Sequence, residues 1–470
     1  MKTKTVRLTK IEITNFKNVE HGVLSFENTR KAYSASILGL YGQNGSGKTA
    51  LIDALSLLKY ALTGQSLPAS FVDFVNVNAE HAKVKYTLQI ANQDTDGIYD
   101  VQYELCIRKE ADESGPNIEQ SPHEPVQYKA AIFDEVLACA YQEEGKKYKL
   151  QPVVDTRTED VFGPASKYKL LVGHNAKTAA TLLAGKQMAA LVSKSFIFSA
   201  ALLNVLRKNC KETLYLDLFE SLIWYGNYEL FVINTARAGL ITMNTLPLTF
   251  QYKEGNRSSA GSLMIHLNAP SLIPQEALER VEKVVRNMNG VLVQLVPGLT
   301  IGVKNLGTEM FPTGDAGIRI QLVSRKNSKD IPLQYESEGI KKIVSVLQLL
   351  IVVYNQASIT VAIDELDAGV FEYLLGELLR IISEKGKGQL IFTSHNLRPL
   401  ETLDKGFIAF TTSNPRNRYI RFANIKTNHN LRDFYYRDIV LGEQSESVYE
   451  PTDNYEIALA FREAGELSGS

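Results

Sequence analysis

The stretch that decides the fold reads Gly42-Gln43-Asn44-Gly45-Ser46-Gly47-Lys48-Thr49. An apolar run at residues 37–41 precedes it, and residues 50–55 follow it with apolar side chains at helical spacing. A phosphate-binding loop requires this setting, because a strand delivers the loop, glycines let successive N–H groups curl around the phosphates, and the next helix points its positive end at them. The stretch therefore predicts a nucleoside triphosphate site rather than an ordinary glycine-rich turn.

Each part of this loop has an expected role. The Lys48 ammonium is expected to reach the β and γ phosphates, and the Thr49 hydroxyl to take one position on Mg²⁺. The expected ligands of the loop are thus a nucleoside triphosphate and Mg²⁺. The predicted nucleotide-binding residues of the loop are Gly42, Asn44, Gly45, Ser46, Gly47, Lys48 and Thr49.

Composition describes a folded, soluble chain of two or three domains. Its 470 residues are 44% hydrophobic, which is ordinary for a globular protein. Lys plus Arg total 51 and Asp plus Glu total 52, so the net charge is −1 and no overall basic field points to nucleic acid. The three cysteines form no C-x-x-C pair, which fits a reducing compartment and argues against a cysteine-based zinc site.

Neither a signal peptide nor a membrane span is expected. The basic amino terminus leads into alternating residues at 11–16, which predict a strand rather than the continuous apolar segment of a signal peptide. The longest apolar stretch, residues 343–354, is too short to cross a bilayer and predicts a buried helix. A cytoplasmic location follows as an expectation.

A second motif lies far along the chain, at Thr360-Val361-Ala362-Ile363-Asp364-Glu365. A β-branched strand ending in two carboxylates can bring a magnesium ligand and a base to the carboxyl edge of a parallel sheet. Alone, two acids at a strand end are usually solvated. Behind a phosphate loop they predict that Asp364 holds Mg²⁺ and that Glu365 polarises the attacking water.

Three further stretches resemble the motifs of ATP-binding-cassette (ABC) ATPases. Leu366-Asp367-Ala368-Gly369 resembles their D-loop, and the stretch at residues 390–396 resembles their next strand with its switch histidine, His395. Residues 335–342 are similar to the short S-x-G signature of the relatives of SMC, RecF and OLD proteins, with Ser337 and Gly339 at the signature positions. These groups at a helix amino terminus suit a γ-phosphate held by another subunit. The resemblance implies a catalytic role for His395 and a homo-oligomer in which ATP lies between two heads.

The resemblance also covers the amino terminus, because residues 8–18 look like the opening strand of SMC and RecF heads. The expected fold class is therefore α/β, an ABC-type, SMC/RecF-like P-loop ATPase head split by a mixed β and helical insertion, without a long coiled coil. The expected domains are 1–110, the first half of the head with a β lobe; 111–264, an insertion of a loop and then a helical subdomain; 265–430, the second half of the head; and 431–470, a carboxyl-terminal extension.

The sequence between the motifs supports this division. Alternation predicts strands at residues 83–90 and 98–108, and the proline-containing segment 110–125 predicts a loop. Apolar residues at helical spacing mark residues 176–231, with no sustained heptads. An amphipathic helix is expected at residues 274–288, stopped by Gly290.

The chain further resembles the AriA-type ATPases of PARIS anti-phage defence systems. That resemblance implies an ATPase that oligomerises, holds a separate AriB-like Toprim nuclease and releases it when a phage-encoded trigger protein is detected. Because most of the residues after Glu365 are needed to finish the head, we expect such a nuclease to be a separate chain.

Two other functions stay open at this stage. The main alternative is a RecF/SMC-like ATPase that clamps or repairs DNA, for which the insertion offers basic residues such as Lys208 and Lys211. A transporter subunit is the weaker alternative. Gln89 is a candidate for the glutamine that couples nucleotide to the rest of the head, although its place in a strand argues against it.

Overall fold

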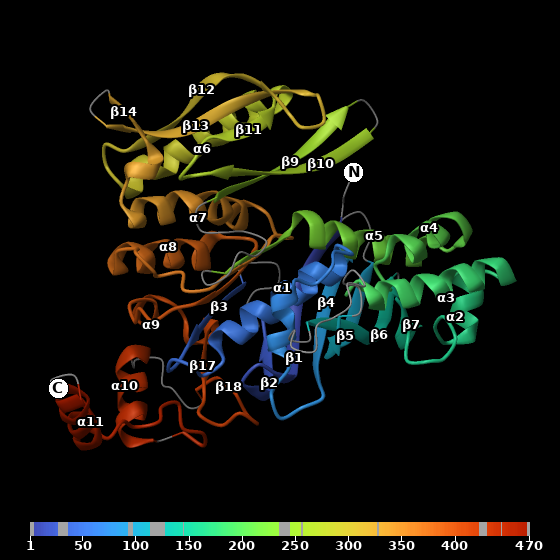
Figure 1. Ribbon diagram of the computed structural model, residues 1–470, viewed down its shortest axis with the longest axis horizontal. Coiled ribbons are helices and arrows are strands. Elements are labelled where there is room, and N and C mark those ends of the chain that lie inside the picture. The colour runs from blue at the N-terminus through green and yellow to red at the C-terminus, as the bar shows by residue number, and fades with distance from the viewer. Residues whose placement is uncertain are drawn as a thin grey trace.

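The computed structural model places helices between and outside several sheets (Figure 1). The described residues are 4–26, 36–92, 97–112, 127–143, 145–234, 245–254, 257–326, 329–422, 430–442 and 444–467. The loop expected at residues 110–125 lies mostly outside these ranges. Among the described helices, none combines the length and apolar character needed to cross a membrane.

A mainly parallel sheet forms the centre of the head, with the order β18-β17-β3-β16-β15-β8. Its strands β17, β3, β16, β15 and β8 run parallel and only β18 pairs antiparallel. The phosphate loop follows β3 and the acidic pair follows β15, with β16 between them, so both motifs meet at one sheet edge. The bounds are β3 (Ser36–Tyr41), β8 (Leu230–Ile233), β15 (Thr360–Ile363), β16 (Gln389–Thr393), β17 (Ile408–Thr411) and β18 (Tyr419–Ile420).

Helix α1 (Lys48–Leu62) begins inside the phosphate loop and is buried between two sheets. It contacts β8, β15 and β16 on one side and β1 on the other, where the Tyr86 hydroxyl donates to the Ala54 carbonyl oxygen at 2.5 Å. The second sheet is antiparallel, in the order β2-β1-β4-β5-β6-β7. Its first strands are β1 (Lys4–Phe16), β2 (Val19–Ser25), β4 (His81–Asn92) and β5 (Ile98–Ala111), which include the strands expected in this part of the chain.

The insertion does not begin as expected. Instead of a loop followed directly by helices, it contains β6 (Tyr128–Glu143) and β7 (Lys146–Asp155), which extend the antiparallel sheet across the boundary placed at residue 110. The helical part then follows, and the domain boundaries themselves stay a prediction. Its helices are α2 (Ala165–Leu171), α3 (Ala176–Leu191), α4 (Ala200–Asn209) and α5 (Thr213–Tyr228), which lie beside the sheet (Figure 1).

A buried carboxylate joins the helical insertion to the sheet. Glu135 on β6 accepts hydrogen bonds from the Tyr103 hydroxyl at 2.6 Å, from the Phe196 amide at 2.7 Å and from the Ser195 hydroxyl. Burial raises the pKa of Glu135, although these donors favour its charged form. Because a buried carboxylate is costly unless its oxygens are satisfied, these bonds fix the segment before α4 against the sheet.

A third lobe lies against the long helix that begins at the signature (Figure 1). Its helix α6 (Leu278–Leu295) does not stop at Gly290 as expected. Leu292 is buried. The side-chain amide of Asn289 donates to the Ile301 carbonyl oxygen and accepts from the Ile301 backbone amide, both at 2.8 Å. Packing therefore outweighs the low helix propensity of glycine. The remaining elements are β9 (Thr245–Glu254), β10 (Arg257–His266), β11 (Ser271–Pro274), β12 (Thr300–Met310), β13 (Ala316–Lys326), β14 (Lys329–Pro332) and α7 (Glu338–Asn355).

The expected fold class is confirmed: the chain is an α/β P-loop head of ABC type carrying a mixed insertion. Within the described ranges the longest helices, α6 and α7, have 18 residues each, so no long coiled-coil arm is present there. The head ends with α8 (Glu372–Lys385), α9 (Pro399–Thr402), α10 (Leu431–Leu441) and α11 (Asn454–Leu467).

Candidate nucleotide site

The phosphate loop has the backbone shape that its glycines predict. Gly45 and Gly47 have φ angles of 75° and 93°, in the left-handed region where a side chain is disfavoured. A side chain at position 42 would clash as well, because a Cβ there would lie 1.7 Å from the Thr411 hydroxyl, so Gly42 must be glycine. Gly47 is the amino-terminal cap of α1, so the positive end of the helix meets the loop.

Lys48 is held over the loop by backbone oxygens. Its ammonium donates to the carbonyl oxygens of Gly42 at 2.8 Å and Gln43 at 2.9 Å. Burial lowers the pKa of Lys48, while the nearby carboxylates Asp364 and Glu365 raise it. The acidic pair therefore helps to keep a poorly solvated ammonium charged, as binding of phosphates requires.

Residues from the carboxyl-terminal part of the chain hold the loop in place. The Ser46 hydroxyl donates to the Gln43 carbonyl at 2.6 Å and contacts Thr411, and the Tyr419 hydroxyl donates to the Gly47 carbonyl at 2.9 Å. These supports carry no signal in the sequence, because Thr411 and Tyr419 follow β16 without any motif of their own.

One threonine orients both acids after β15. The Thr393 hydroxyl donates to Asp364 Oδ1 at 2.6 Å and accepts from the Glu365 amide at 2.7 Å. Glu365 has a φ of 49°, a left-handed conformation that costs a non-glycine residue roughly 1–2 kcal/mol. Asp364 is buried while the Glu365 side chain is exposed, so the strained backbone turns the second acid outward.

A buried lysine also supports this strained position. Lys342, on α7, donates from its ammonium to the Glu365 carbonyl oxygen at 3.1 Å. Burial lowers the pKa of Lys342 to about 8, against the attraction of Asp367, Glu365 and Asp364. Lys342 lies three residues after the signature glycine, and the sequence analysis assigned it no role.

The D-loop contacts both neighbouring motifs. Asp367 Oδ2 accepts hydrogen bonds from the backbone amides of His395 at 3.1 Å and Asn396 at 2.9 Å. The D-loop also lies close to the signature. A Cβ at Gly339 would be 2.3 Å from the carbonyl oxygen of Gly369 in the D-loop, so the signature needs glycine at this position. The predicted D-loop, signature and histidine are thus adjacent in the fold.

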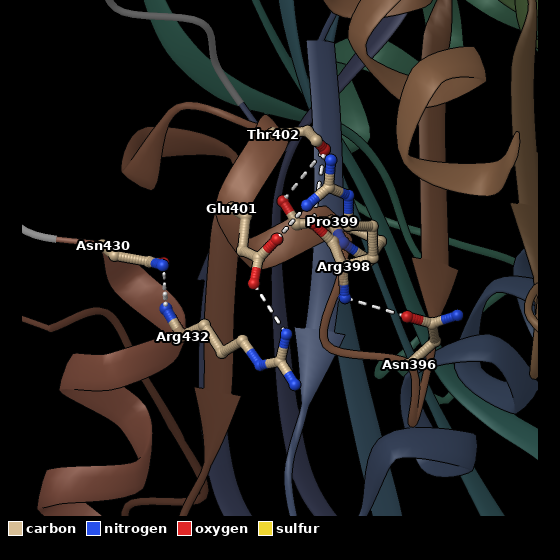
Figure 2. A network of polar contacts seen from close by, with 7 residues as sticks. All are labelled: Asn396, Arg398, Pro399, Glu401, Thr402, Asn430 and Arg432. Carbon is tan, nitrogen blue, oxygen red and sulfur yellow. Dashed lines mark hydrogen bonds and ion pairs between the residues drawn. The ribbon is translucent and has the colours of Figure 1, made fainter. Parts of the chain in front are cut away.

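Figure 2 shows how the segment after His395 is fixed to the rest of the head. Glu401 accepts hydrogen bonds from Arg398 and, at 2.7 Å, from Arg432 of α10. The Arg398 amide in turn donates to the Asn396 side-chain oxygen at 2.8 Å. The two arginines lower the pKa of Glu401, Arg432 most strongly, so the network stays ionised and holds the loop that carries His395.

A cavity of about 360 Å³ opens where these elements meet. Its lining brings together loop residues, both acids of the second motif and His395. Lys17, Asn18 and Thr393 also line it and were not predicted, although the first two lie in the SMC-like opening stretch. Gln89 lines no part of it and donates to Asp100 at 3.2 Å instead. The lining residues include Asn44, Gly45, Gly47, Lys48, Thr49, Asp364, Glu365 and His395.

The signature serine lies outside this cavity. Ser337 is exposed, caps α7 by accepting from the Ile340 amide at 3.4 Å, and does not line the cavity, and neither does Gly339. The phosphate loop and the signature of one chain are therefore two separate surfaces. Gly42 and Ser46 shape the loop from behind rather than line the cavity.

The oxygen donors in the cavity fit Mg²⁺. Thr49 offers a hydroxyl and Asp364 a carboxylate whose Oδ1 is oriented by Thr393. No cluster of three or more His, Cys, Asp or Glu side chains suited to a metal occurs among the described residues.

Comparisons with known proteins agree with this geometry. Residues 10–151 match the family model described as an AAA domain. The DNA replication and repair protein RecF of Deinococcus radiodurans is 33% identical over 84 residues, which is 18% of this chain and 21% of RecF, so the match spans about a fifth of that relative.

Solved structures give weaker likenesses. The SMC head domain from Thermotoga maritima has a TM-score of 0.33 and 14% identity, covering 89% of this chain and 100% of that one. The recombination mediator protein RecF in the RecFOR pathway has a TM-score of 0.35 and 14% identity, covering 89% of this chain and 99% of that one. Both scores are too low to establish a common arrangement of the whole chain. The comparisons therefore show a likeness to an AAA domain within residues 10–151 and a short sequence likeness to RecF.

Proposed function

We propose that this protein hydrolyses ATP with Mg²⁺ in a site completed by a second copy of the chain, and that the assembly is the sensor and scaffold of an anti-phage defence system. The observation that carries the first part is the separation of Ser337 from the cavity that contains Lys48 and Glu365. An ATP held in the cavity can meet a signature helix only when another chain presents one.

In this proposal each group of residues in the site has a separate role. The loop amides and Lys48 bind the phosphates, and the ion held by Thr49 and Asp364 would neutralise charge on them. Glu365 polarises the attacking water, and His395 contacts the γ-phosphate or that water. The Ser337 hydroxyl and the Gly339 amide of the other copy then bind the same γ-phosphate, so contact between heads depends on the state of the nucleotide.

Mixing two inactive variants tests the shared site. Lys48→Ala impairs the phosphate loop, and Ser337→Arg blocks the signature with a bulky cation. Each variant alone should hydrolyse ATP at background rate. An equal mixture should recover about a quarter of wild-type activity, because half of randomly formed dimers are mixed and each mixed dimer has one intact site of two.

The readout is phosphate release as a function of the mixing ratio. Mixtures of each variant with a Lys48→Ala, Ser337→Arg double variant are the control, since no intact site can form there. An equal mixture that stays at background while both variants still associate would contradict the shared site.

The defence role extends the sequence resemblance to AriA-type ATPases and predicts a partner. We expect the Glu365→Gln variant, purified with ATP from cells that express its native gene neighbourhood, to bring down a Toprim-type nuclease in a complex of high mass. Challenge with phage should release that nuclease through a phage-encoded trigger protein. Mass determination and peptide sequencing of the purified complex check the first step.

The same purification distinguishes the RecF-like alternative. Homodimers that carry DNA, and lose it at high salt, would favour a DNA-clamping ATPase, because phosphate contacts weaken steeply with ionic strength. A complex unaffected by nuclease and containing a second protein supports the scaffold. The short match to RecF includes too little of either chain to decide between the two.

A further inference from the structure

A second cavity lies in the insertion, away from the nucleotide site. Its volume is about 390 Å³, and it is bounded by β6 and β7, by α2 and by the beginning of α5. None of its lining residues lines the nucleotide cavity. Sites for small ligands begin at about 300 Å³, so this volume suits one compact group.

Aromatic rings dominate one wall of this cavity. Tyr99, Tyr141 and Tyr148 are directly opposite one another on β5, β6 and β7, and the last two line the cavity. The rings of Tyr141 and Tyr148 are nearly parallel, at 23°, with centroids 6.3 Å apart. Tyr148 is 58% exposed although it stands beside a cavity, so its ring is accessible for stacking.

Lysines line the same cavity. Lys149 on β7 is exposed, and Lys167 on α2 donates to the Tyr215 hydroxyl at 2.5 Å with its ammonium 4.9 Å from the centre of that ring. Among the described lining residues, Glu212 is the only acid. Exposed Lys147, Lys169 and Lys211 lie within two residues of the lining, as does exposed Asp217, which pairs with Lys4. Lysines therefore outnumber acids among the exposed described residues here, in a chain with net charge −1.

We propose that this cavity binds a nucleotide of single-stranded nucleic acid. A base would stack on the exposed ring of Tyr148, and its phosphate would lie between the ammonium groups of Lys149 and Lys167. Glu212 can accept a hydrogen bond from the ring N3–H of thymine or uracil, or from an exocyclic amine of another base. Duplex nucleic acid is excluded as the ligand, because a paired and stacked base offers no face to the tyrosine. An acidic peptide would use the lysines but leave the tyrosines without a stacking partner.

The test measures binding of a fluorescein-labelled thymidine dodecamer and its uridine counterpart by fluorescence anisotropy. Tyr148→Ala should weaken binding about ten-fold, the loss of one stacked base. Tyr128→Ala is the matched control, because Tyr128 is an exposed tyrosine at the other end of β6. Equal affinity of wild type and Tyr148→Ala, or no binding by wild type, would overturn the proposal.

Salt dependence tests the phosphate contact separately. Lys149→Gln should reduce the slope of log affinity against log salt by about 0.7, the value for one phosphate contact on a single strand. Lys304→Gln, an exposed lysine on β12, should leave the slope unchanged. An unchanged slope in Lys149→Gln would remove this lysine from the site and overturn the phosphate placement.

Two further experiments distinguish a nucleic-acid strand from a free nucleotide, and this cavity from the ATP site. Thymidine monophosphate that displaces the dodecamer at equal nucleotide concentration would assign the cavity to free nucleotides and overturn binding of a strand. Lys48→Ala should bind the dodecamer as tightly as wild type, since the ATP site is not involved. A loss of binding in that variant would place the strand at the ATP site instead. This inference stands independently of the proposed defence role.

Discussion

Lys48→Ala is expected to weaken ATP binding about 100-fold or more, because two charge-assisted hydrogen bonds to phosphate are worth about 3 kcal/mol or more together. Among the described residues that line the cavity, the only other lysine is Lys17, which cannot replace Lys48, since its ammonium is 2.5 Å from a carboxylate oxygen of buried Asp53. Lys48 instead donates to neutral backbone carbonyls, so its charge is available to the phosphates. Hydrolysis and any nucleotide-dependent association should be lost with binding.

Isothermal titration calorimetry with ATP and Mg²⁺ measures this effect. Lys385→Ala is the matched control, because Lys385 is exposed at the end of α8 and does not line the cavity. Thermal unfolding of both variants checks that the loop survives the loss of the two carbonyl contacts. Wild-type ATP affinity in a folded Lys48→Ala protein would remove this residue from the phosphate-binding role.

The central sheet was predictable because its strands are buried on both faces. The runs at 37–41, 360–363 and 390–393 are apolar apart from Thr360 and Thr393, and the structure has β3, β15 and β16 there. Since each is followed by polar or charged residues, the motifs alone indicated that these residues meet at one sheet edge. The D-loop, the signature and His395 were assigned from the family resemblance, but their contacts with one another were not predicted.

The insertion was less predictable for physical reasons. β7 is the edge strand of its sheet, contains Pro152 and several lysines, and so lacks the β-branched alternation that marks a half-buried strand. Its pairing with β6 depends on partners rather than on local propensity. The same limit applies to Lys342 and Tyr419, whose contacts with Glu365 and Gly47 depend on the packing of distant segments.

Glu365→Gln is expected to lower the rate of ATP hydrolysis about 100- to 1000-fold with ATP binding retained, because the substitution removes the base and little else. Glutamine has nearly the same shape, and the contacts that hold this position involve the backbone: the amide donates to Thr393 and the carbonyl accepts from Lys342. The strained φ of 49° and the direction of the side chain should therefore persist. Loss of one negative charge beside the phosphates also favours bound ATP.

Two measurements on Glu365→Gln separate the chemistry from the assembly. Phosphate release reports the base, with Glu372→Gln on α8 as an exposed, matched control outside the cavity. Light scattering during size-exclusion chromatography with ATP reports association, which should increase because the γ-phosphate between the heads is no longer removed. Turnover at the wild-type rate would exclude Glu365 as the base and leave His395 as the remaining candidate in the cavity. Slow turnover without association would keep the base and reject the shared site, because a retained γ-phosphate would then have no second head to bind.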